Sequence, residues 1–197
     1  MDHDYDFIIP PKPYRQGRLD GLCGLYACIN AQRFIQSVGR PKRRLPWRAL
    51  FYDCLELLGE TWNLSDIVAY GMTSQQLWSC AKHLRDRLET KHQATSLLTR
   101  PLIGIGHKSA KQIFAKLQRS LEKSDRAAIL GYDGPYFSHW TTLSHIVNKQ
   151  LMLFDSAGTR SLDGTRFVFR DERIDDLASS YHFTPTSLIV VQLPKRR

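Results

Sequence analysis

Residues 16–30 read QGRLDGLCGLYACIN, and the interpretation of the whole chain starts from this stretch. A charged, glycine-containing loop runs into a segment whose apolar residues follow the i, i+3, i+4, i+7 spacing of one helical face: Leu22, Leu25, Tyr26 and Ile29. The spacing predicts a helix over residues 22–37, with Asp20 as its N-cap. Cys23 then lies in the first turn, where unpaired N–H groups and the helix dipole favour a thiolate. Cys23 is therefore a candidate nucleophile.

The length and composition fit one globular domain. The chain has 197 residues, 42% hydrophobic and 24% charged, which is enough for a sizeable core. We therefore expect a single domain over residues 1–197. Only a short apolar run, residues 7–9, lies near the acidic start, and no stretch is long enough to span a bilayer. We expect a cytoplasmic protein, or an effector delivered into another cell by a route without a cleaved signal peptide.

The cysteines and the charge narrow the choice of cofactor and partner. None of the four cysteines belongs to a Cys-x-x-Cys pair, so no metal or other cofactor is expected, and a reducing setting fits best. Cys28, Cys54 and Cys80 are expected to be small buried hydrophobes. The net charge of +9 is partly concentrated in residues 40–44 and 195–197. It indicates either solvated segments or an acidic partner, such as a ubiquitin-like or other protein chain; no nucleic-acid motif accompanies it.

Helical periodicity comes first along the chain and strand patterns come later. Thr73 and Gln76 have the form of a capping box that opens a helix. Further helices are expected at residues 47–58, 64–70 and 109–121. Strands are expected at residues 101–105, 127–131, 139–147, 150–155, 166–170 and 187–193. The order predicts an α+β fold in which a helical part, residues 1–125, packs on an antiparallel sheet formed by residues 126–197.

A nucleophilic cysteine needs an imidazole to take its proton and a third group to orient that imidazole. Among the seven histidines, His139 opens a strand directly after the loop 134–138, where a side chain can face a cleft and still be held rigidly. A hairpin turn at residues 147–150 would bring the end of the next strand, Asp155, beside His139. A register slip of one residue would bring Ser156 there instead.

An oxyanion donor completes such a site. The side-chain amide of Gln16 and the backbone N–H of Cys23 are placed to hold the negative oxygen of a tetrahedral intermediate. Gln32 and Gln36 are alternative donors, because they also lie on or near the helix. Gly24 is expected to leave room beside the sulfur for a substrate carbonyl.

Three motifs of this chain together resemble the papain-like cysteine peptidase superfamily. They are Gln16 before Cys23-Gly24 at a helix start, His139-Trp140 at the start of a strand, and Asp155 at the end of the next strand. The chain is also similar to permuted SUMO-specific proteases and to bacterial leader-cleaving peptidases. Papain usually has asparagine at the position of Asp155. The resemblance implies a papain-like fold, with Cys23 as nucleophile, His139 as base and then acid, Asp155 orienting His139, and Gln16 in the oxyanion hole. It also suggests that Trp140 shields the His139–Asp155 pair from water.

The expected function is therefore hydrolysis of a peptide or isopeptide bond in a protein or peptide substrate, through an acyl-enzyme on Cys23. The same catalytic group would serve a transglutaminase or a glutamine deamidase, which differ in the acyl acceptor. An alternative from another class is a non-catalytic basic module that binds protein or nucleic acid.

Overall fold

The computed structural model describes residues 12–17, 21–39, 44–100, 110–123, 125–134, 137–169 and 180–194. The helices within these ranges are α1 (Cys23–Gly39), α2 (Trp47–Thr61), α3 (Leu64–Tyr70), α4 (Ser74–His92) and α5 (Ala110–Leu121). The strands are β1 (Leu97–Thr99), β2 (Arg126–Asp133), β3 (Ser138–Val147), β4 (Gln150–Leu153), β5 (Ser161–Asp163), β6 (Phe167–Phe169), β7 (Tyr181–Phe183) and β8 (Leu188–Gln192). Two short 3-10 helices, η1 (Gly164–Arg166) and η3 (Pro185–Ser187), join them.

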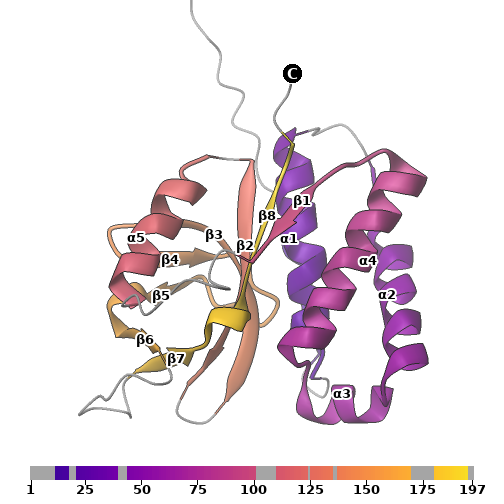
Figure 1. The fold of residues 1–197 in the computed structure, drawn as a ribbon, viewed down its shortest axis with the longest axis horizontal. Helices are drawn as coiled ribbons and strands as arrows, with labels where there is room; N and C mark the ends of the chain where they lie inside the picture. Colours follow the sequence, from indigo (N-terminus) through magenta and orange to yellow (C-terminus); the bar gives the residue numbers. More distant parts are fainter. Residues whose placement is uncertain are drawn as a thin grey trace, which may run out of the picture.

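An eight-stranded sheet forms the centre of the molecule (Figure 1). Its main path runs β1-β8-β2-β3-β4-β5, and all pairs along this path are antiparallel. β7 pairs with the end of β2 and, in parallel, with β6. The expected α+β class is confirmed. The division near residue 125 is not strict, because β1 leaves the helical part of the chain to pair with β8.

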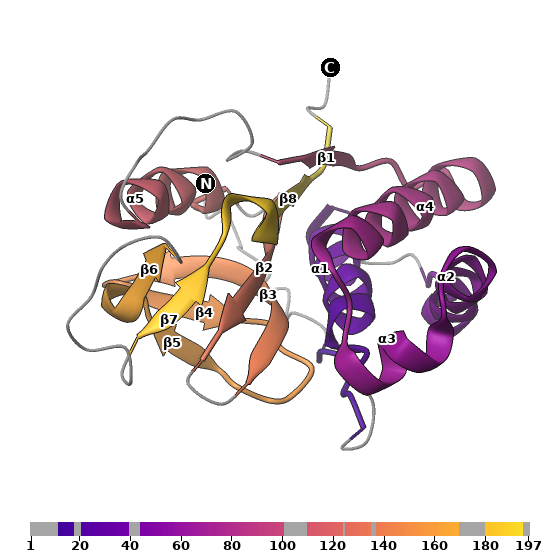
Figure 2. The same ribbon diagram turned by 60° about the horizontal axis from the view of Figure 1, so that its bottom comes forward.

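Helices cover both faces of this sheet. α1 packs on one face with α4 and α2 outside it, and α5 lies against the other face (Figures 1 and 2). Alternation along β2 explains the two layers, since Ala127 and Ile129 join the core on the α1 side whereas Ala128 and Leu130 join the core under α5. The helical part therefore does not form one layer on the sheet, because α5 crosses to the opposite face.

Helix α1 is confirmed, but its burial is not confined to one face. Polar positions such as Asn30 and Gln32 are as buried as Leu25, because α1 lies between the sheet and the outer helices. Gly24 belongs to this packing. A Cβ added to Gly24 would lie 2.9 Å from Sδ of Met72, so the missing side chain lets the helix approach the start of α4. The expectation that Gly24 opens space beside the sulfur was wrong.

The expected β3–β4 hairpin is present and contains an irregularity. Asn148 and Lys149 form its turn with positive φ values of 49° and 66°. The register pairs His145 with Met152, and then shifts so that Leu143 pairs with Leu153. The extra residue, Ser144, forms a β-bulge, and its hydroxyl donates to the carbonyl of Met152 at 2.9 Å. This hydroxyl satisfies a carbonyl where the ladder is interrupted.

Several other expectations can be compared with the described residues. The capping box at Thr73 is confirmed. Strands β5 and β7 were not predicted. The strand expected at 101–105, the N-cap Asp20 and the tail 195–197 lie outside the described residues, as do all but Arg44 of the loop 40–44. None of the described helices has the length and apolar character needed to cross a membrane.

Candidate active site

Cys23 is the first residue of α1 and is 7% exposed. The chain just before it is fixed by the end of α3, where the N–H of Gly21 donates to the carbonyl of Val68 at 2.7 Å. A Cβ on Gly21 would lie 2.7 Å from that same oxygen, so only glycine allows this approach. The Cys23 sulfur therefore occupies a defined place at the positive end of a 17-residue helix.

His139 and Asp155 form a close pair. Nε2 of His139 lies 2.8 Å from Oδ1 of Asp155, whose side chain is fully buried. The carboxylate also accepts from the hydroxyl of Thr141 at 2.8 Å and from the backbone N–H groups of Gly158 and Thr159 at 2.9 and 3.2 Å. Burial alone would raise the pKa of Asp155, but the bonds and charge of His139 and the other donors lower it. Asp155 is therefore held as a carboxylate.

The β-bulge at Ser144 determines that Asp155 faces His139. Next to the turn, residue 145 pairs with residue 152. If the same register continued along both strands, Asp155 would lie opposite Thr142. Thr142 faces the helices, because its hydroxyl donates to the carbonyl of Ala27. The one-residue shift places Asp155 opposite Thr141 instead, on the same face as His139. Ser156, the other neighbour considered from the sequence, contacts Gln16, whose side-chain oxygen accepts from the Ser156 hydroxyl at 3.4 Å.

The imidazole of His139 links Asp155 to Cys23. Burial lowers the pKa of His139, but hydrogen bonds to the Asp155 carboxylate and the Cys23 thiol, with the charges of both groups, raise it to about 9. Since Nε2 faces Asp155, Nδ1 is the ring nitrogen that remains for the sulfur. The ring of Tyr132 stands at 85° to the imidazole, with centroids 5.9 Å apart, and supports it from the neighbouring strand. Cys23, His139 and Asp155 are thus brought together.

Gln16 reaches the same place through the N-terminal strap, our name for residues 12–17. Its backbone N–H donates to the carbonyl of Ser156 at 3.2 Å, and its side-chain oxygen accepts from the hydroxyl of Ser156 at 3.4 Å. Further along the strap, the side chain of Asn30 bonds both the N–H and the carbonyl of Tyr14. Helix α1 therefore carries Cys23 and also holds the segment that carries Gln16.

The alternative glutamines lie elsewhere. Gln32 donates to the hydroxyl of Ser96 at 2.8 Å, and the amide of Gln36 lies 3.4 Å from the carbonyl of Thr95. Both contacts hold the segment that leads into β1. Among the three glutamines, Gln16 is therefore the one whose bonds reach Ser156, the residue that follows Asp155.

Trp140 does not cover the pair. It points to the opposite face of β3 from His139, and its indole N–H donates to the carbonyl of Met72 at 2.8 Å. The shielding role expected from the sequence is wrong because neighbouring residues in a strand face opposite sides. Thr141, Tyr132 and Asn30 were not predicted as parts of the site. Thr141 had a signal, since it lies two residues from His139 and so shares its face.

Among the described residues, no group of three histidine, cysteine or acidic side chains could hold a metal ion. Comparison with protein-family models, with curated proteins and with solved structures found no match.

Proposed function

We propose that this protein is a papain-like cysteine hydrolase that cleaves a peptide or isopeptide bond through an acyl-enzyme on Cys23. One observation carries the proposal: the His139 imidazole bonds the buried Asp155 carboxylate and lies close enough to the Cys23 thiol that both groups raise its pKa. This is the relation that an activated nucleophile, its base and an orienting acid require.

In the first step His139, whose pKa is raised to about 9, already holds the proton that the Cys23 sulfur has given up. The thiolate then attacks the substrate carbonyl, and the C–O π electrons move to the oxygen to give a tetrahedral oxyanion. The start of α1 supports this charge, because the backbone N–H groups of the first helical turn point toward it. Collapse of the intermediate breaks the C–N bond, and His139 returns its proton to the leaving amine. The product is a thioester on Cys23.

In the second step His139 accepts a proton from water, and the resulting hydroxide attacks the thioester carbonyl. The C–S bond breaks, the acid product leaves, and the sulfur returns to its place beside the protonated His139. Asp155 keeps the ring oriented and stabilises its charged form in both steps, and the buried Thr141 hydroxyl holds Asp155 in turn. The Gln16 amide supplies a second donor for the oxyanion, since its oxygen is taken by Ser156 and its NH2 is the donating end.

Alkylation tests the proposal directly. Iodoacetamide at neutral pH should modify one site promptly, and peptide mapping should assign it to Cys23. His139→Ala should slow this reaction, because the thiolate loses the imidazolium that stabilises it. His83→Ala is the matched control, since His83 lies on α4 and accepts a hydrogen bond from Arg87.

Mass analysis of peptides incubated with the protein should show cleavage with uptake of one water. Slow modification of Cys23 that is equal in the wild type and in His139→Ala would contradict the proposal. So would modification that is prompt at Cys54 or Cys80 and absent at Cys23.

A further inference from the structure

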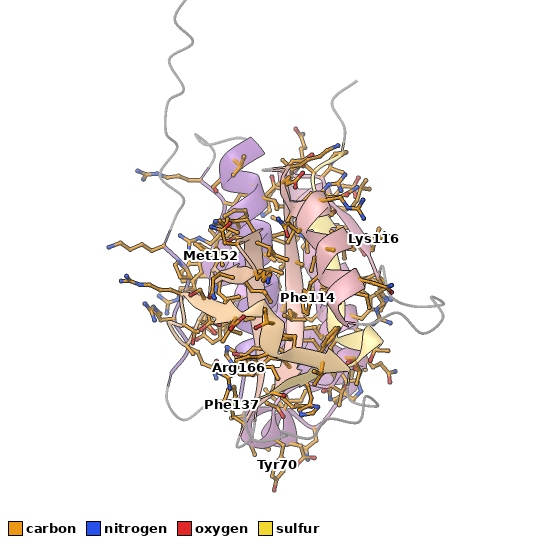
Figure 3. All side chains as sticks on the ribbon, turned by 90° about the vertical axis from the view of Figure 1, so that its left-hand side faces the viewer. Tyr70, Phe114, Lys116, Phe137, Met152 and Arg166 are labelled. Atoms are coloured by element: carbon orange, nitrogen blue, oxygen red, sulfur yellow. The ribbon has the colours of Figure 1, made fainter. Side chains whose placement is uncertain are left out.

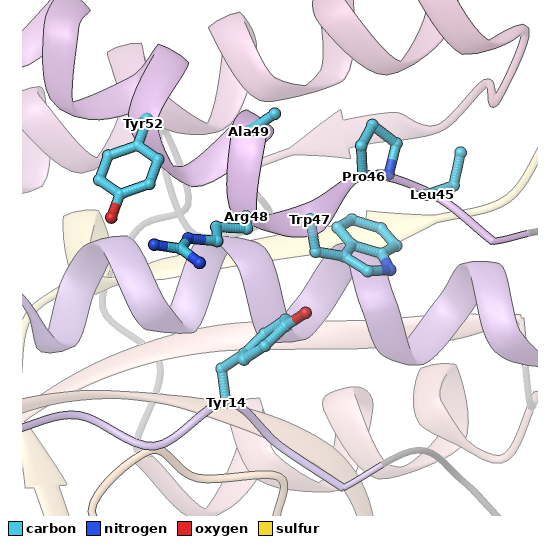
Figure 4. Close-up of a pocket in the computed structure, with 7 residues that line it drawn as sticks. All are labelled: Tyr14, Leu45, Pro46, Trp47, Arg48, Ala49 and Tyr52. Carbon is cyan, nitrogen blue, oxygen red and sulfur yellow. The ribbon is translucent and has the colours of Figure 1, made fainter.

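A groove lies between the first turn of α2 and the N-terminal strap (Figure 4). Its volume is about 570 Å³, and its lining includes Tyr14, Leu45, Pro46, Trp47, Arg48 and Tyr52. Figure 4 shows Tyr14 extending from the strap toward the turn that carries Trp47 and Arg48. The groove is distinct from the contacts that join Cys23, His139 and Asp155.

The composition of this groove is that of a recognition surface. Tyr14 and Tyr52 are 39% and 49% exposed, although tyrosine gains from burying its ring. Guanidinium groups accompany both rings: Arg33 lies 4.2 Å from the ring centre of Tyr14, and Arg48 lies 5.8 Å from that of Tyr52. Tyrosine, tryptophan and arginine are the residues that most often dominate the binding energy of protein interfaces. The groove therefore offers apolar contact together with positive charge.

The start of α2 adds to the positive charge. Its N-cap, Pro46, makes no side-chain capping bond, and its first turn has no acidic residue. Arg48 instead occupies that turn, where the helix dipole disfavours a cation. No acidic residue lines the groove. A carboxylate from a partner would offset both the dipole and the arginine charges.

The groove is within reach of the candidate active site. Tyr14 is bonded to Asn30, which lies seven residues beyond Cys23 on α1. At 1.5 Å per residue that separation is about 10 Å. Tyr14 also precedes Gln16 by two residues on the strap. An extended peptide advances about 3.3 Å per residue, so a span of this order corresponds to about three residues of a bound substrate.

We propose that this groove docks an acidic segment of the protein substrate, with an aromatic or aliphatic side chain seated among Tyr14, Trp47 and Tyr52. The inference rests on the proposed function and names the substrate class for the same site. The aliphatic lining, which includes Leu45, Pro46 and Ala49, favours an amino-acid side chain over a stack of bases. The guanidinium of Arg33 also lies close to the face of the Tyr14 ring.

Binding can be measured without catalysis. The probe is a short fluorescein-labelled peptide of alternating glutamate and leucine with a central tryptophan, and the protein is the full chain with Cys23→Ala. Fluorescence anisotropy should show binding that weakens as salt is added. Arg48→Glu should raise the Kd on the order of tenfold, because it reverses the charge that faces the peptide. Tyr52→Ala should raise it several-fold through lost apolar contact.

The matched control is Lys116→Glu, which makes the same charge change on α5, across the sheet from the groove (Figures 1 and 3). An equal loss in Lys116→Glu would overturn the proposal, because binding would then follow net charge alone. Equal binding of the glutamine version of the peptide would also overturn it.

Two further results would assign the groove to another occupant and overturn the proposal. One is tighter, Arg48-dependent binding of a single-stranded oligonucleotide. The other is peptide binding that appears only after removal of the chain's own acidic residues 1–11. Failure of Cys23 alkylation would reject the proposed function and leave these binding results unchanged, so the two failures are distinguishable.

Discussion

Helix α1 carries two cysteines in opposite situations, only five positions apart. Cys28 lies in the helical core, where it forms a buried group with Cys54 of α2 and Cys80 of α4. There the pKa of Cys54 is raised by a hydrogen bond with Cys80 and by burial, and the pKa of Cys80 is raised through Cys28 and burial. Cys23, at the start of the helix, faces an imidazole that a carboxylate orients.

The comparison shows that burial does not decide the chemistry of these thiols. Cys23 is itself only 7% exposed, close to the core cysteines. What differs is the neighbouring group, since a thiol beside other thiols has no base to take its proton, whereas Cys23 has His139. The position within the helix differs as well, because Cys28 lies beyond the first turn, where the dipole effect has fallen off.

The largest expected difference between the two regions comes from removing each thiol. Cys23→Ala should abolish both prompt alkylation and hydrolysis while leaving the fold intact. Cys80→Ala should keep both activities but lower the free energy of unfolding by about 1–3 kcal/mol, because it leaves a cavity in the core. Alkylation followed by mass spectrometry and urea unfolding measure the two effects. Hydrolysis that survives in Cys23→Ala would contradict the claim that Cys23, unlike the core cysteines, is the nucleophile.

The next effect concerns the carboxylate that makes His139 different from an ordinary strand histidine. Asp155→Asn keeps the shape but removes the charge that stabilises the imidazolium, so kcat/KM should fall by about 10²- to 10⁴-fold. Urea unfolding should show that the variant is folded. Asp163→Asn is the control, because Asp163 also bonds a threonine but does so at an exposed turn. An unchanged rate in Asp155→Asn would show that the pair is only structural.

A smaller effect is expected at the oxyanion donor. Gln16→Ala should lower kcat by about 10²- to 10³-fold with little change in KM, because the lost bond forms to the tetrahedral intermediate. Alkylation of Cys23 by iodoacetamide has no such intermediate and should be nearly unaffected. Gln36→Ala should leave kcat unchanged. A loss confined to KM in Gln16→Ala would assign Gln16 to substrate binding instead.

The smallest effect is the pH dependence of stability. The folded-state pKa of His139 is about 9, above its ordinary value of 6.5. Its stabilising contribution is therefore complete below pH 6.5 and is lost as the pH rises through about 9. Burial lowers the pKa of His145 on the same strand, so His145 has the opposite sign and costs stability in acid. Urea unfolding of His139→Ala should match the wild type more closely at alkaline than at neutral pH; a constant gap would contradict this.

Sequence patterns predicted the features of this molecule that depend on local spacing. The helix that starts at Cys23, the capping box at Thr73 and the turn at Asn148 and Lys149 all follow from residues close together in the chain. The hairpin brings the two strands of His139 and Asp155 side by side, although the bulge at Ser144, which the sequence did not predict, is what turns Asp155 toward His139. These parts were predictable because short-range backbone preferences decide them.

The features that sequence reasoning missed depend on contacts that are distant in the chain. The close approach of Gly24 depends on Met72, which lies far away in the chain. Asn30 looked like an ordinary helix residue until the strap was found against it. Asn30 lies 16 residues from Tyr14, and among the described residues no hairpin or other regular element joins the two, so no local pattern indicates the contact.

The bulge at Ser144 has a consequence for how many molecules in a preparation can react. A hairpin with the same turn and no shift would direct Asp155 toward α1 and away from His139, so a chain in that register would lack the proposed catalytic pair. Active-site titration would count such chains as missing equivalents, and spectra of secondary structure would not distinguish them. The hydroxyl of Ser144 at the carbonyl of Met152 thus bears on the stoichiometry of active sites per chain, although it touches neither the sulfur nor the imidazole of the candidate site.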